Sequence, residues 1–364
     1  MIDYVEGDLL KADADALVNT VNTVGVMGKG VALQFKRALP ANFKAYQTAC
    51  KRGEVEVGRM FVFDAGQLIR PRYIINFPTK THWKARSRLA DVEAGLRDLR
   101  RVLEELSITS VAVPPLGCGS GGLDWRDVRP LIAHALGDLE KVHVLVYEPK
   151  GAPRADQMGV GTAKPKMTPG RAVLIGLLDR YLGLAALGAS PIEVQKLMYF
   201  AQRAGEPLRL GFEAGRYGPY AEALNHVLDD MEGHYLRGYG DRSRRVTEAE
   251  PIQLLSGAAD EAETWLTEHP EAAERIRRVI DLTDGFQSAY ELELLASVDW
   301  VGHTPGGAAA EDPHTAYELV QQWSERKMRL FTERHVKLAW QRLDDQGWLG
   351  QPVPLAGLHQ EVTD

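Results

Sequence analysis

The chain has 364 residues, of which 45% are hydrophobic and 26% are charged. This length is too great for one ordinary domain and predicts two, and the hydrophobic content is sufficient for packed cores. No stretch approaches the roughly 18 apolar residues of a membrane-spanning helix, so the composition excludes a helical membrane protein and predicts no membrane partner.

The N-terminal segment and the cysteines indicate a cytoplasmic protein. The chain begins MIDYVEGDLL, with acidic side chains where a signal peptide would have basic ones. The two cysteines, Cys50 and Cys118, have neither the spacing of a metal site nor that of a disulfide framework. The sequence therefore predicts a reducing cytoplasmic location, no bound metal and no cofactor.

The net charge of −7 is divided unevenly along the chain. Residues 1–155 contain 22 Lys and Arg against 18 Asp and Glu, a net charge of +4. The remaining residues contain 21 against 32, a net charge of −11. A basic half attracts phosphate, whereas an acidic half repels it and attracts proteins that bind phosphate. The alternative is that the surplus acid only keeps a domain soluble.

Short apolar runs alternate with amphipathic patterns over the first 150 residues. Apolar residues recurring every three or four positions predict helices at 30–38, 42–51, 87–106 and 125–137. Buried strands are predicted at 2–5, 16–21, 60–63, 73–77, 111–113 and 142–147. The alternation predicts an α/β domain over residues 1–150, with a mixed sheet sandwiched between helices.

The alternation ends at residue 148, and the next residues are rich in proline and glycine, which predicts a linker over 151–171. The remainder, residues 172–364, is predicted to be mainly helical. Within it, Ser190-Pro191-Ile192-Glu193 has the pattern of a capping box with proline at the first helical position. Further helices are predicted at 219–233, 257–268, 271–281, 287–299, 314–324 and 332–345.

The first two predicted strands lead to polar and glycine-rich segments. Asp8 is suited to accept a hydrogen bond from an amine such as that of adenine, although a helix N-cap is the commoner role. In VNTVNTVGVMGKGVA, at residues 18–32, a buried strand runs into polar amides, glycines and a helix start. Glycines let a ligand approach the backbone, and a helix N-terminus presents unpaired N–H groups to anions. Asn22 is suited to hydrogen-bond sugar hydroxyls with both ends of its amide.

The most informative segment is VAVPPLGCGSGGLDW at residues 111–125, where a strand leads into four glycines within six residues. A helix is predicted to begin near Asp124. Such a loop forms a nest of N–H groups suited to a pyrophosphate. It is neither the Rossmann pattern, which follows the first strand, nor a P-loop, which ends in Gly-Lys-Ser or Gly-Lys-Thr. Two phosphate-friendly loops in one domain favour a ligand with a diphosphate.

Lys80 directly follows a predicted buried strand, a position where side chains face a pocket. The ammonium of Lys80 is suited to protonate or stabilise a leaving group, whereas a partly desolvated amine is suited to act as a nucleophile. The alternative is a phosphate-contacting or solvated lysine. His82 is a candidate proton carrier, or a ring that stacks on a base beside Trp83. Contacts with a phosphate backbone are predicted for Lys84, Arg86 and Arg88.

Together these residues resemble the macrodomain family, whose members bind ADP-ribose. The similarity covers residues 1–150 and rests on the early GDLL, the loop ending in MGKGVA, and the late PPLGCGSGGLDW. Within the family, MGKGVALQF followed by NFPTKTHWKARS resembles the branch that contains the DarG-type antitoxins of DarTG toxin–antitoxin systems and a human terminal ADP-ribose glycohydrolase. The resemblance implies a hydrolase that removes ADP-ribose from thymidine in single-stranded DNA, a DNA ADP-ribosyl glycohydrolase.

The resemblance also implies roles for individual residues. It implies that Lys80 is catalytic, that Asp8 binds the adenine amine, that the loop Gly117–Leu123 holds the diphosphate and that the loop Asn22–Gly30 holds the distal ribose. The implied ADP-ribose-binding residues are Asp8, Leu9, Asn22, Met27, Gly28, Lys29, Gly30, Thr79, Gly117, Cys118, Gly119, Ser120, Gly121, Gly122 and Leu123.

One position departs from the family pattern. A human member of this branch has an aspartate in the late glycine loop as the partner of the lysine, and the corresponding position here is Gly121. The nearest acidic residue is Asp124, which is either an auxiliary group for Lys80 or the cap of the next helix. A lysine–aspartate dyad is therefore not expected to carry over unchanged.

By its position, the acidic half at residues 172–364 resembles the C-terminal domain of DarG-type antitoxins, which neutralises the DarT toxin by contact. Candidates for imitating DNA phosphates in a toxin cleft are Asp229, Asp230, Glu232, Asp241, the acids of 248–263, Glu291, Glu293 and Asp299. The predicted partners are the DarT toxin, ADP-ribosylated single-stranded DNA and ADP-ribose. Two alternatives for the first half are a non-catalytic ADP-ribose reader and an O-acetyl-ADP-ribose deacetylase.

Overall fold

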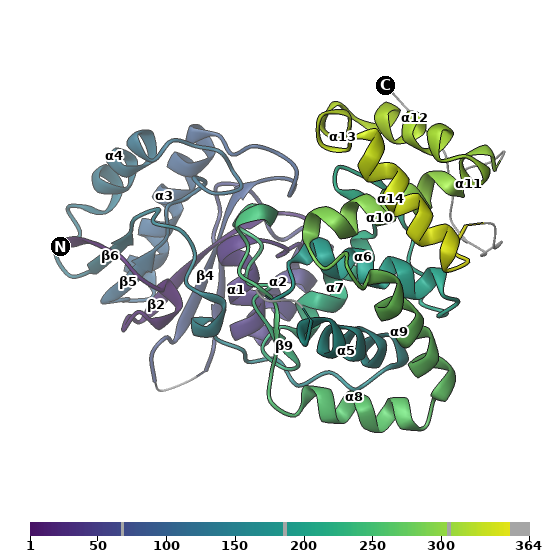
Figure 1. Cartoon of the computed structure of the whole chain (residues 1–364). Coiled ribbons are helices and arrows are strands. Elements are labelled where there is room, and N and C mark those ends of the chain that lie inside the picture. Colours follow the sequence, from purple (N-terminus) through teal and green to yellow (C-terminus); the bar gives the residue numbers. More distant parts are fainter. Residues whose placement is uncertain (67–68, 185–187, 304–306, 350–364) are drawn as a thin grey trace. The chain divides into compact units, whose positions relative to one another are not determined.

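The chain forms two compact units (Figure 1). The structure, a computed structural model, describes residues 1–66, 69–184, 188–303 and 307–349. The first unit is Met1–Ala163 together with Gly240–Arg245, and the second is Lys164–Tyr239 together with Val246–Asp364. The short return of the chain to the first unit was not predicted from the sequence. Within the described ranges, no helix has the length and apolar character needed to cross a membrane.

The first unit is built on a six-stranded mixed sheet with the strand order β1-β6-β5-β2-β4-β3. All neighbouring strands are parallel except β3, which pairs antiparallel with β4 at one edge. The strands are β1 (Ile2–Val5), β2 (Ala16–Asn22), β3 (Phe61–Asp64), β4 (Tyr73–Lys80), β5 (Ser110–Val113) and β6 (His143–Tyr147). The predicted α/β fold with a mixed sheet is confirmed.

Helices cover both faces of this sheet because residues along each strand alternate between the faces (Figure 1). On β2, Val18 packs in the cluster that includes α3 (Leu89–Glu105) and α4 (Trp125–Leu136), whereas Leu17 packs in the opposite cluster with Phe35 of α1. The remaining helices of the unit are α1 (Gly30–Ala38), α2 (Pro40–Lys51) and the short 3-10 turns η1 (Leu9–Lys11) and η2 (Ala155–Gln157). Helix α3 packs so closely on the sheet that a Cβ at its Gly95 would lie 2.3 Å from the ring of Phe77.

The fold brings the loops of interest together. In a parallel sheet the carboxyl ends of the strands meet at one edge, and ligands bind in the crevice outside that edge. The segments that follow β1, β2, β4 and β5 therefore share an edge, and they contain Asp8, the loop Asn22–Gly30, Lys80 and the loop Gly117–Leu123. The predicted strand at 73–77 is three residues longer than expected, so Lys80 is the last strand residue and not the first loop residue.

The second unit is mainly helical (Figure 1). Its helices are α5 (Pro169–Leu182), α6 (Pro191–Arg203), α7 (Glu222–Met231), α8 (Ala258–Thr267), α9 (Pro270–Thr283), α10 (Ala289–Gly302), α11 (Ala308–Glu311), α12 (Pro313–Trp323), α13 (Glu325–Leu330) and α14 (Glu333–Asp345). It also contains two short ribbons, β7 (Glu213–Gly215) with β8 (Gly218–Tyr220) and β9 (Leu236–Arg237) with β10 (Gln253–Leu254), and the 3-10 turn η3 (Val246–Glu248).

The start of α5 corrects the predicted linker. Because α5 begins at Pro169, the last residues of the predicted linker 151–171 form the first turn of a helix. The helix begins with proline and glycine, both within the predicted linker, although proline is well tolerated at the first helical position. The predicted capping box is confirmed, since the Ser190 hydroxyl accepts from the Glu193 amide and the Glu193 carboxylate accepts from the Ser190 amide.

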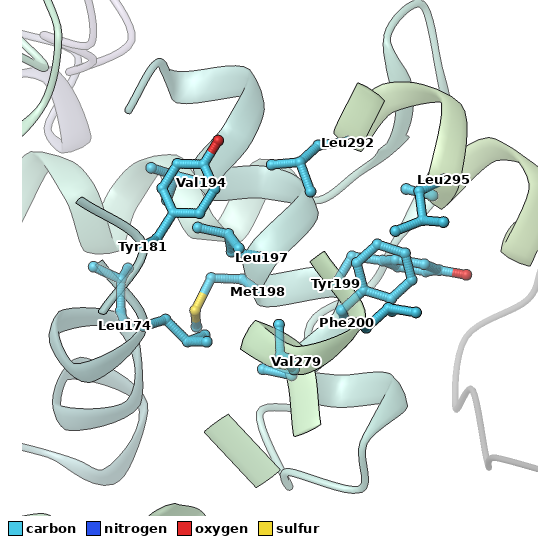
Figure 2. Close-up of a cluster of buried hydrophobic side chains, with 14 of the residues drawn as sticks. Leu174, Tyr181, Val194, Leu197, Met198, Tyr199, Phe200, Val279, Leu292 and Leu295 are labelled. Atoms are coloured by element: carbon cyan, nitrogen blue, oxygen red, sulfur yellow. The ribbon is translucent and has the colours of Figure 1, made fainter. Parts of the chain in front are cut away.

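Helices α6 and α10 are buried on nearly all sides and form the centre of the second unit. Figure 2 shows Leu197 and Met198 of α6 among side chains from α5, α9 and α10, including Leu174, Val279 and Leu292. A helix that is buried all round must also bury its polar side chains, and these need partners. The unit therefore contains buried ion pairs.

Several acidic residues supply those buried pairs, which corrects one prediction. Asp299 accepts from Arg203 and from the hydroxyl of Tyr199, and Glu293 accepts from Lys327. Four of the acids predicted to imitate DNA phosphates are at most 4% exposed, namely Glu232, Asp241, Glu293 and Asp299. Buried carboxylates cannot present charge to a partner, so the prediction is wrong for these four.

Candidate active site at the carboxyl edge of the sheet

Asn22, at the end of β2, shapes the first glycine loop. Its side-chain Nδ2 donates to the carbonyl of Val26 at 2.6 Å, and its Oδ1 accepts from the amides of Val24 and Val26. The hydroxyl of Tyr46, buried in α2, donates to the backbone carbonyl of Asn22 at 2.5 Å. Both ends of the Asn22 amide are thus engaged within the loop. A contact of Asn22 with a ribose stays a prediction, but the structure gives the side chain a role in fixing the loop.

The far end of this loop is the start of α1. Met27 is buried, and its sulfur lies 3.8 Å from Nδ2 of Asn19. Lys29 is the N-cap position of α1 without a side-chain cap hydrogen bond, and Gly28 precedes it. Gly30 has a φ of +61° and donates its amide to the carbonyl of Asp241 at 2.8 Å. The Gly30 amide is therefore occupied by a protein acceptor, and this acceptor comes from the segment Gly240–Arg245.

The second glycine loop leaves a run of amides unused. The amides of Cys118, Gly122 and Leu123 donate to carbonyls within the loop or directly before it, which fixes its bends. By contrast, no hydrogen bond is found for the amides of Gly119, Ser120 or Gly121 within the described residues. Consecutive unpaired amides are what an anion-binding nest provides. This loop therefore has donors suited to the two phosphates of ADP-ribose.

Gly121 has no room for any side chain. A Cβ at this position would lie 2.3 Å from the hydroxyl of Ser87 and 2.4 Å from the carbonyl of Gly117. Ser87 is itself buried, and its amide donates to the carbonyl of Gly121 at 3.0 Å. Position 121 therefore requires glycine, and the loop Gly117–Leu123 contains no carboxylate.

The amine of Lys80 reaches the second glycine loop. Its Nζ donates to the carbonyl of Ser120 and to the carbonyl of Trp83, each at 3.1 Å. The residue is 9% exposed, and burial lowers the pKa of its amine below the ordinary lysine value. In the sheet Lys80 pairs in register with Asn22, at a point where the register shifts. Lys80 therefore lies at the junction of the two glycine loops.

Lys80 has no carboxylate within salt-bridge distance in the described part of the chain. Asp124 is the N-cap of α4, accepting from the Arg126 amide at 2.9 Å, and it forms an ion pair with the Arg126 side chain. Hydrogen bonds from Arg126 lower the pKa of Asp124 to about 2. Of the two roles predicted for Asp124, the structure shows the helix cap. An auxiliary role toward Lys80 gains no support from a contact.

The two rings after Lys80 lie at the surface. His82 is exposed, and its Nδ1 lies 3.2 Å from the amide of Lys84. The rings of His82 and Trp83 are 5.4 Å apart, and Trp83 is 48% exposed. Thr79, just before Lys80, is buried, and its hydroxyl faces the carbonyl of Val21 at 3.4 Å. An exposed aromatic pair beside a buried amine is suited to stacking on a base.

Asp8 lies toward the opposite end of the edge. Its Oδ1 accepts from the Leu10 amide at 3.0 Å, so it caps η1, while Leu9 is buried. Val5, at the end of β1, pairs with Tyr147 at the end of β6, and burial followed by the charge of Asp8 raises the pKa of Tyr147. Four strand spacings of about 4.8 Å, or roughly 19 Å, separate β1 from β4. The edge thus has the elongated shape that a dinucleotide-like ligand needs.

Some contributors to this site gave no signal in the sequence. Ser87 and Tyr46 act on the two glycine loops through contacts distant in sequence, and Asp241 reaches α1 from more than 200 residues away. No local pattern indicates such contacts. Within the described residues there is also no group of His, Cys, Asp or Glu side chains suited to hold a metal ion.

Comparisons with known proteins agree with this geometry. The Macro domain family model matches residues 18–132. The whole chain is 48% identical to the DNA ADP-ribosyl glycohydrolase of Thermus aquaticus, with 100% of both chains covered. The chain belongs to the DNA ADP-ribosyl glycohydrolase family. The resemblance predicted from the two glycine loops is therefore confirmed.

Two further relatives each match part of the chain. A DNA ADP-ribosyl transferase–DNA ADP-ribosyl glycohydrolase fusion protein of Thermosipho africanus is 38% identical over 41% of this chain and 42% of its own length. The solved macrodomain of Mycobacterium tuberculosis DarG is 62% identical over 41% of this chain and 99% of its own, with a TM-score of 0.41. The fusion protein links this family to an ADP-ribosyl transferase.

Proposed function

We propose that this protein hydrolyses the N-glycosidic bond between ADP-ribose and thymidine in single-stranded DNA. The oxygen of water forms a bond to the anomeric carbon, the bond from that carbon to the base nitrogen breaks, and the base keeps the electron pair and gains a proton. The observation that carries the proposal is the position of the Lys80 amine. It donates to the carbonyl of Ser120 in the second glycine loop, and Lys80 itself is the last residue of β4, where it pairs with Asn22.

In this proposal ADP-ribose lies along the carboxyl edge of the sheet. Asp8 binds the adenine amine with the carboxylate oxygen that does not cap η1. The amides of Gly119, Ser120 and Gly121 hold the diphosphate, and the loop Asn22–Gly30 encloses the distal ribose. The anomeric carbon then faces Lys80. Three features along this edge support the order. The described residues offer no hydrogen-bond acceptor to the amides of the second glycine loop named above, the Asn22 side chain fixes the first glycine loop, and the Lys80 amine is buried.

Lys80 has two possible roles in this reaction, and its pKa separates them. If the neutral amine attacks the anomeric carbon, it displaces the base and forms a glycosyl–lysine bond that water then breaks, and the rate rises with pH until the lowered pKa of Lys80 is passed. If the ammonium protonates or stabilises the leaving base, the rate falls as pH rises through that pKa. The absence of a carboxylate partner among the described contacts of Lys80 favours the neutral amine, because only backbone dipoles offset the cost of burying its charge. A pH–rate profile under single-turnover conditions decides between the two.

The direct test is an assay with a single-stranded oligonucleotide that contains one ADP-ribosylated thymidine. We expect the wild-type chain to release free ADP-ribose and unmodified oligonucleotide, and Lys80→Ala to lose this activity. Lys141→Ala is the matched control, because Lys141 is an exposed lysine just before the amino end of β6, at the opposite edge of the sheet. Binding of the oligonucleotide without release identifies a non-catalytic reader. Release of acetate from O-acetyl-ADP-ribose in its place identifies a deacetylase.

We further propose that the second unit binds the DarT toxin by imitating DNA. The Thermosipho africanus relative joins a DNA ADP-ribosyl transferase and a DNA ADP-ribosyl glycohydrolase in one chain, which supports a transferase as the binding partner. After the four buried acids are set aside, α8 has three exposed acids, Asp260, Glu261 and Glu263, of which Glu261 pairs with Lys164 and Glu263 with Arg180. Opposite charges on two partners raise the association rate, and salt reduces that gain. A cytoplasmic location and a role in DNA repair stay predictions that follow from this function.

The toxin proposal is tested with full-length chains in which the α8 charge is neutralised. Asp260→Asn, Glu261→Gln and Glu263→Gln together should slow association with purified DarT at least about tenfold at low salt. Neutralising three exposed acids of other helices, Glu311, Glu318 and Glu325, is the matched control and should have little effect. Equal association rates for both triple variants would exclude α8 as the toxin-binding surface.

A further inference from the structure

The segment Gly240–Arg245 is anchored on helix α1 of the first unit. The carbonyl of Asp241 accepts from the Gly30 amide at 2.8 Å, and its carboxylate accepts from the Gln34 side chain at 2.6 Å. The carbonyl of Gly240 accepts from the Arg37 guanidinium at 2.7 Å. Asp241, Gln34 and Arg37 are at most 8% exposed. The segment therefore packs as part of the first unit, although the residues that flank it in sequence on both sides belong to the second unit.

The backbone of this segment is tightly bent. Gly240 has a φ of +60°, and Arg242 has a φ of +62°, in the left-handed region that residues other than glycine seldom adopt. The carboxylate of Asp241 also accepts from the amide and the hydroxyl of Ser243, which closes the turn. Strained residues persist only where surrounding contacts hold them, and they occur preferentially at functional sites. The turn thus holds the residues after Asp241 in a fixed place.

The charge of the segment is opposite to that of its surroundings in sequence. The chain after residue 155 has a net charge of −11, yet Arg242, Arg244 and Arg245 give this segment three positive charges against one negative charge. Arg244 and Arg245 are exposed. The Asp241 carbonyl accepts from the Gly30 amide. Arg242 is the residue after Asp241 and Lys29 is the residue before Gly30, so both cations are next to this hydrogen bond in sequence. The segment therefore adds positive charge to the helix end where the first glycine loop stops.

That location lies at one end of the loop proposed to hold the distal ribose. The loop begins at Asn22, which pairs with Lys80, and ends at Gly30, which binds Asp241. The proposed site of the distal ribose lies between these two ends, so a strand attached to that ribose continues beside this loop. Each nucleotide of a single strand has one phosphate, and arginine binds phosphate well because its guanidinium presents a rigid fork of donors.

We propose that Arg242, Arg244 and Arg245 bind phosphates of the substrate strand beside the modified thymidine. This inference rests on the proposed hydrolase function and adds a DNA-binding site to it. The anchor at Asp241 places the site, and the three arginines supply the charge. The chain of the second half thereby completes the substrate surface of the first unit. The exposed run after Lys80, with Lys84 and Arg86, flanks the reacting group from its own loop.

The test uses the full-length chain with Arg242→Gln, Arg244→Gln and Arg245→Gln combined, which leaves Gly240 and Asp241 intact. The matched control removes three exposed cations elsewhere in the first unit, with Arg97→Gln, Arg101→Gln and Lys141→Gln combined. The first readout is the affinity for an unmodified single-stranded oligonucleotide, measured by fluorescence anisotropy at several salt concentrations. A lost phosphate contact reduces the slope of log affinity against log salt by about 0.7, so a reduction of about 2 is expected for three contacts.

The second readout compares two substrates. We expect kcat/KM for the ADP-ribosylated oligonucleotide to fall at least about tenfold at low salt, with kcat/KM for ADP-ribosylated thymidine nucleoside and the Kd of ADP-ribose unchanged. An equal fall on both substrates would show that the segment only supports the fold, and wild-type behaviour in both readouts would also overturn the proposal. If the wild-type chain cleaves neither substrate, the proposed hydrolase function fails, while the salt dependence of oligonucleotide binding still decides this inference.

Discussion

The two units both bury lysine side chains, and they do so in different ways. Lys327 in the second unit is fully buried, and its amine binds the carboxylate of Glu293 at 2.9 Å and the hydroxyl of Ser297 at 2.8 Å. Lys80 in the first unit is 9% exposed, and the partners of its amine among the described residues are the backbone carbonyls of Trp83 and Ser120. A carboxylate partner compensates the charge of Lys327 inside the core. Lys80 is left with a lowered pKa beside the two glycine loops that we propose to bind ADP-ribose.

Lys196 is another buried lysine with a lowered pKa, and it belongs to α6 of the second unit, outside the candidate site. Its amine donates to the carbonyl of Pro219 at 2.6 Å, and burial together with the charge of Lys327 lowers its pKa to about 7. The residue is 1% exposed, and a Cβ at Gly218 of the β7–β8 hairpin would lie 3.5 Å from its Nζ. A lowered lysine pKa is thus found in both units, and it is the position between the two glycine loops of the first unit that supports the role we propose for Lys80.

The largest stability effect is expected from breaking the paired lysine. Glu293→Gln leaves the charge of Lys327 buried without its carboxylate, which should cost about 3–5 kcal/mol of unfolding free energy. Urea unfolding followed by tryptophan fluorescence measures this change. The control is Glu325→Gln, because Glu325 is an exposed residue of the same unit and its loss should leave the midpoint unchanged. A small effect of Glu293→Gln would mean that the pair does not stabilise the core.

The second largest effect concerns the loop that Lys80 contacts. Gly121→Ala places a Cβ 2.3 Å from the Ser87 hydroxyl, so the loop must shift, at a cost of about 1–3 kcal/mol. The same shift displaces the unpaired amides and should weaken ADP-ribose binding at least about tenfold. Calorimetry with ADP-ribose measures the affinity. Gly119→Ala is the matched control for folding stability, since nothing lies within 4 Å of a Cβ there. Unchanged affinity of Gly121→Ala for ADP-ribose would show that this loop does not bind the diphosphate.

The smallest effect is the pH dependence of stability caused by Lys196. Between pH 7 and the ordinary lysine pKa the unfolded chain holds a proton that the folded chain lacks, so stability rises with pH. Relative to Lys196→Met, the wild-type chain should gain about 1.4 kcal/mol for each pH unit above pH 7. Urea unfolding of both chains at about pH 7.5 and about pH 8.5, two values between the folded and unfolded pKa of Lys196, tests this prediction. Parallel behaviour of the two chains would contradict a neutral Lys196.

Much of the first unit was predictable from its sequence because its signals are local. Alternating strands and helices fix the order of elements, and glycine-rich runs after strands fix the two loops. The position of Lys80 followed from the strand before it, although the strand extends to include it. What could not be predicted are contacts between distant residues. The hydroxyl of Ser87 behind Gly121 and the anchor of Asp241 on α1 depend on tertiary packing, and no local pattern indicates either.

The second unit was less predictable, for a related reason. Its helices were found near their observed positions, but α5 began inside the predicted linker, and the short α11 and α13 were missed. The charges were the harder part. An acidic composition suggests an acidic surface, yet Glu293 and Asp299 are buried with basic partners on other helices. Composition counts charges, whereas only the fold shows which of them face solvent.

The most direct test of the account is to measure binding and cleavage side by side in Lys80→Ala. If the two loops bind ADP-ribose and the Lys80 amine performs the cleavage, the Kd of ADP-ribose should stay within a few-fold of the wild-type value. Under single-turnover conditions, release of ADP-ribose from the modified oligonucleotide should then fall by about 10²- to 10⁴-fold. Cleavage that persists at the wild-type rate, or affinity that falls as steeply as the rate, would contradict this division of roles.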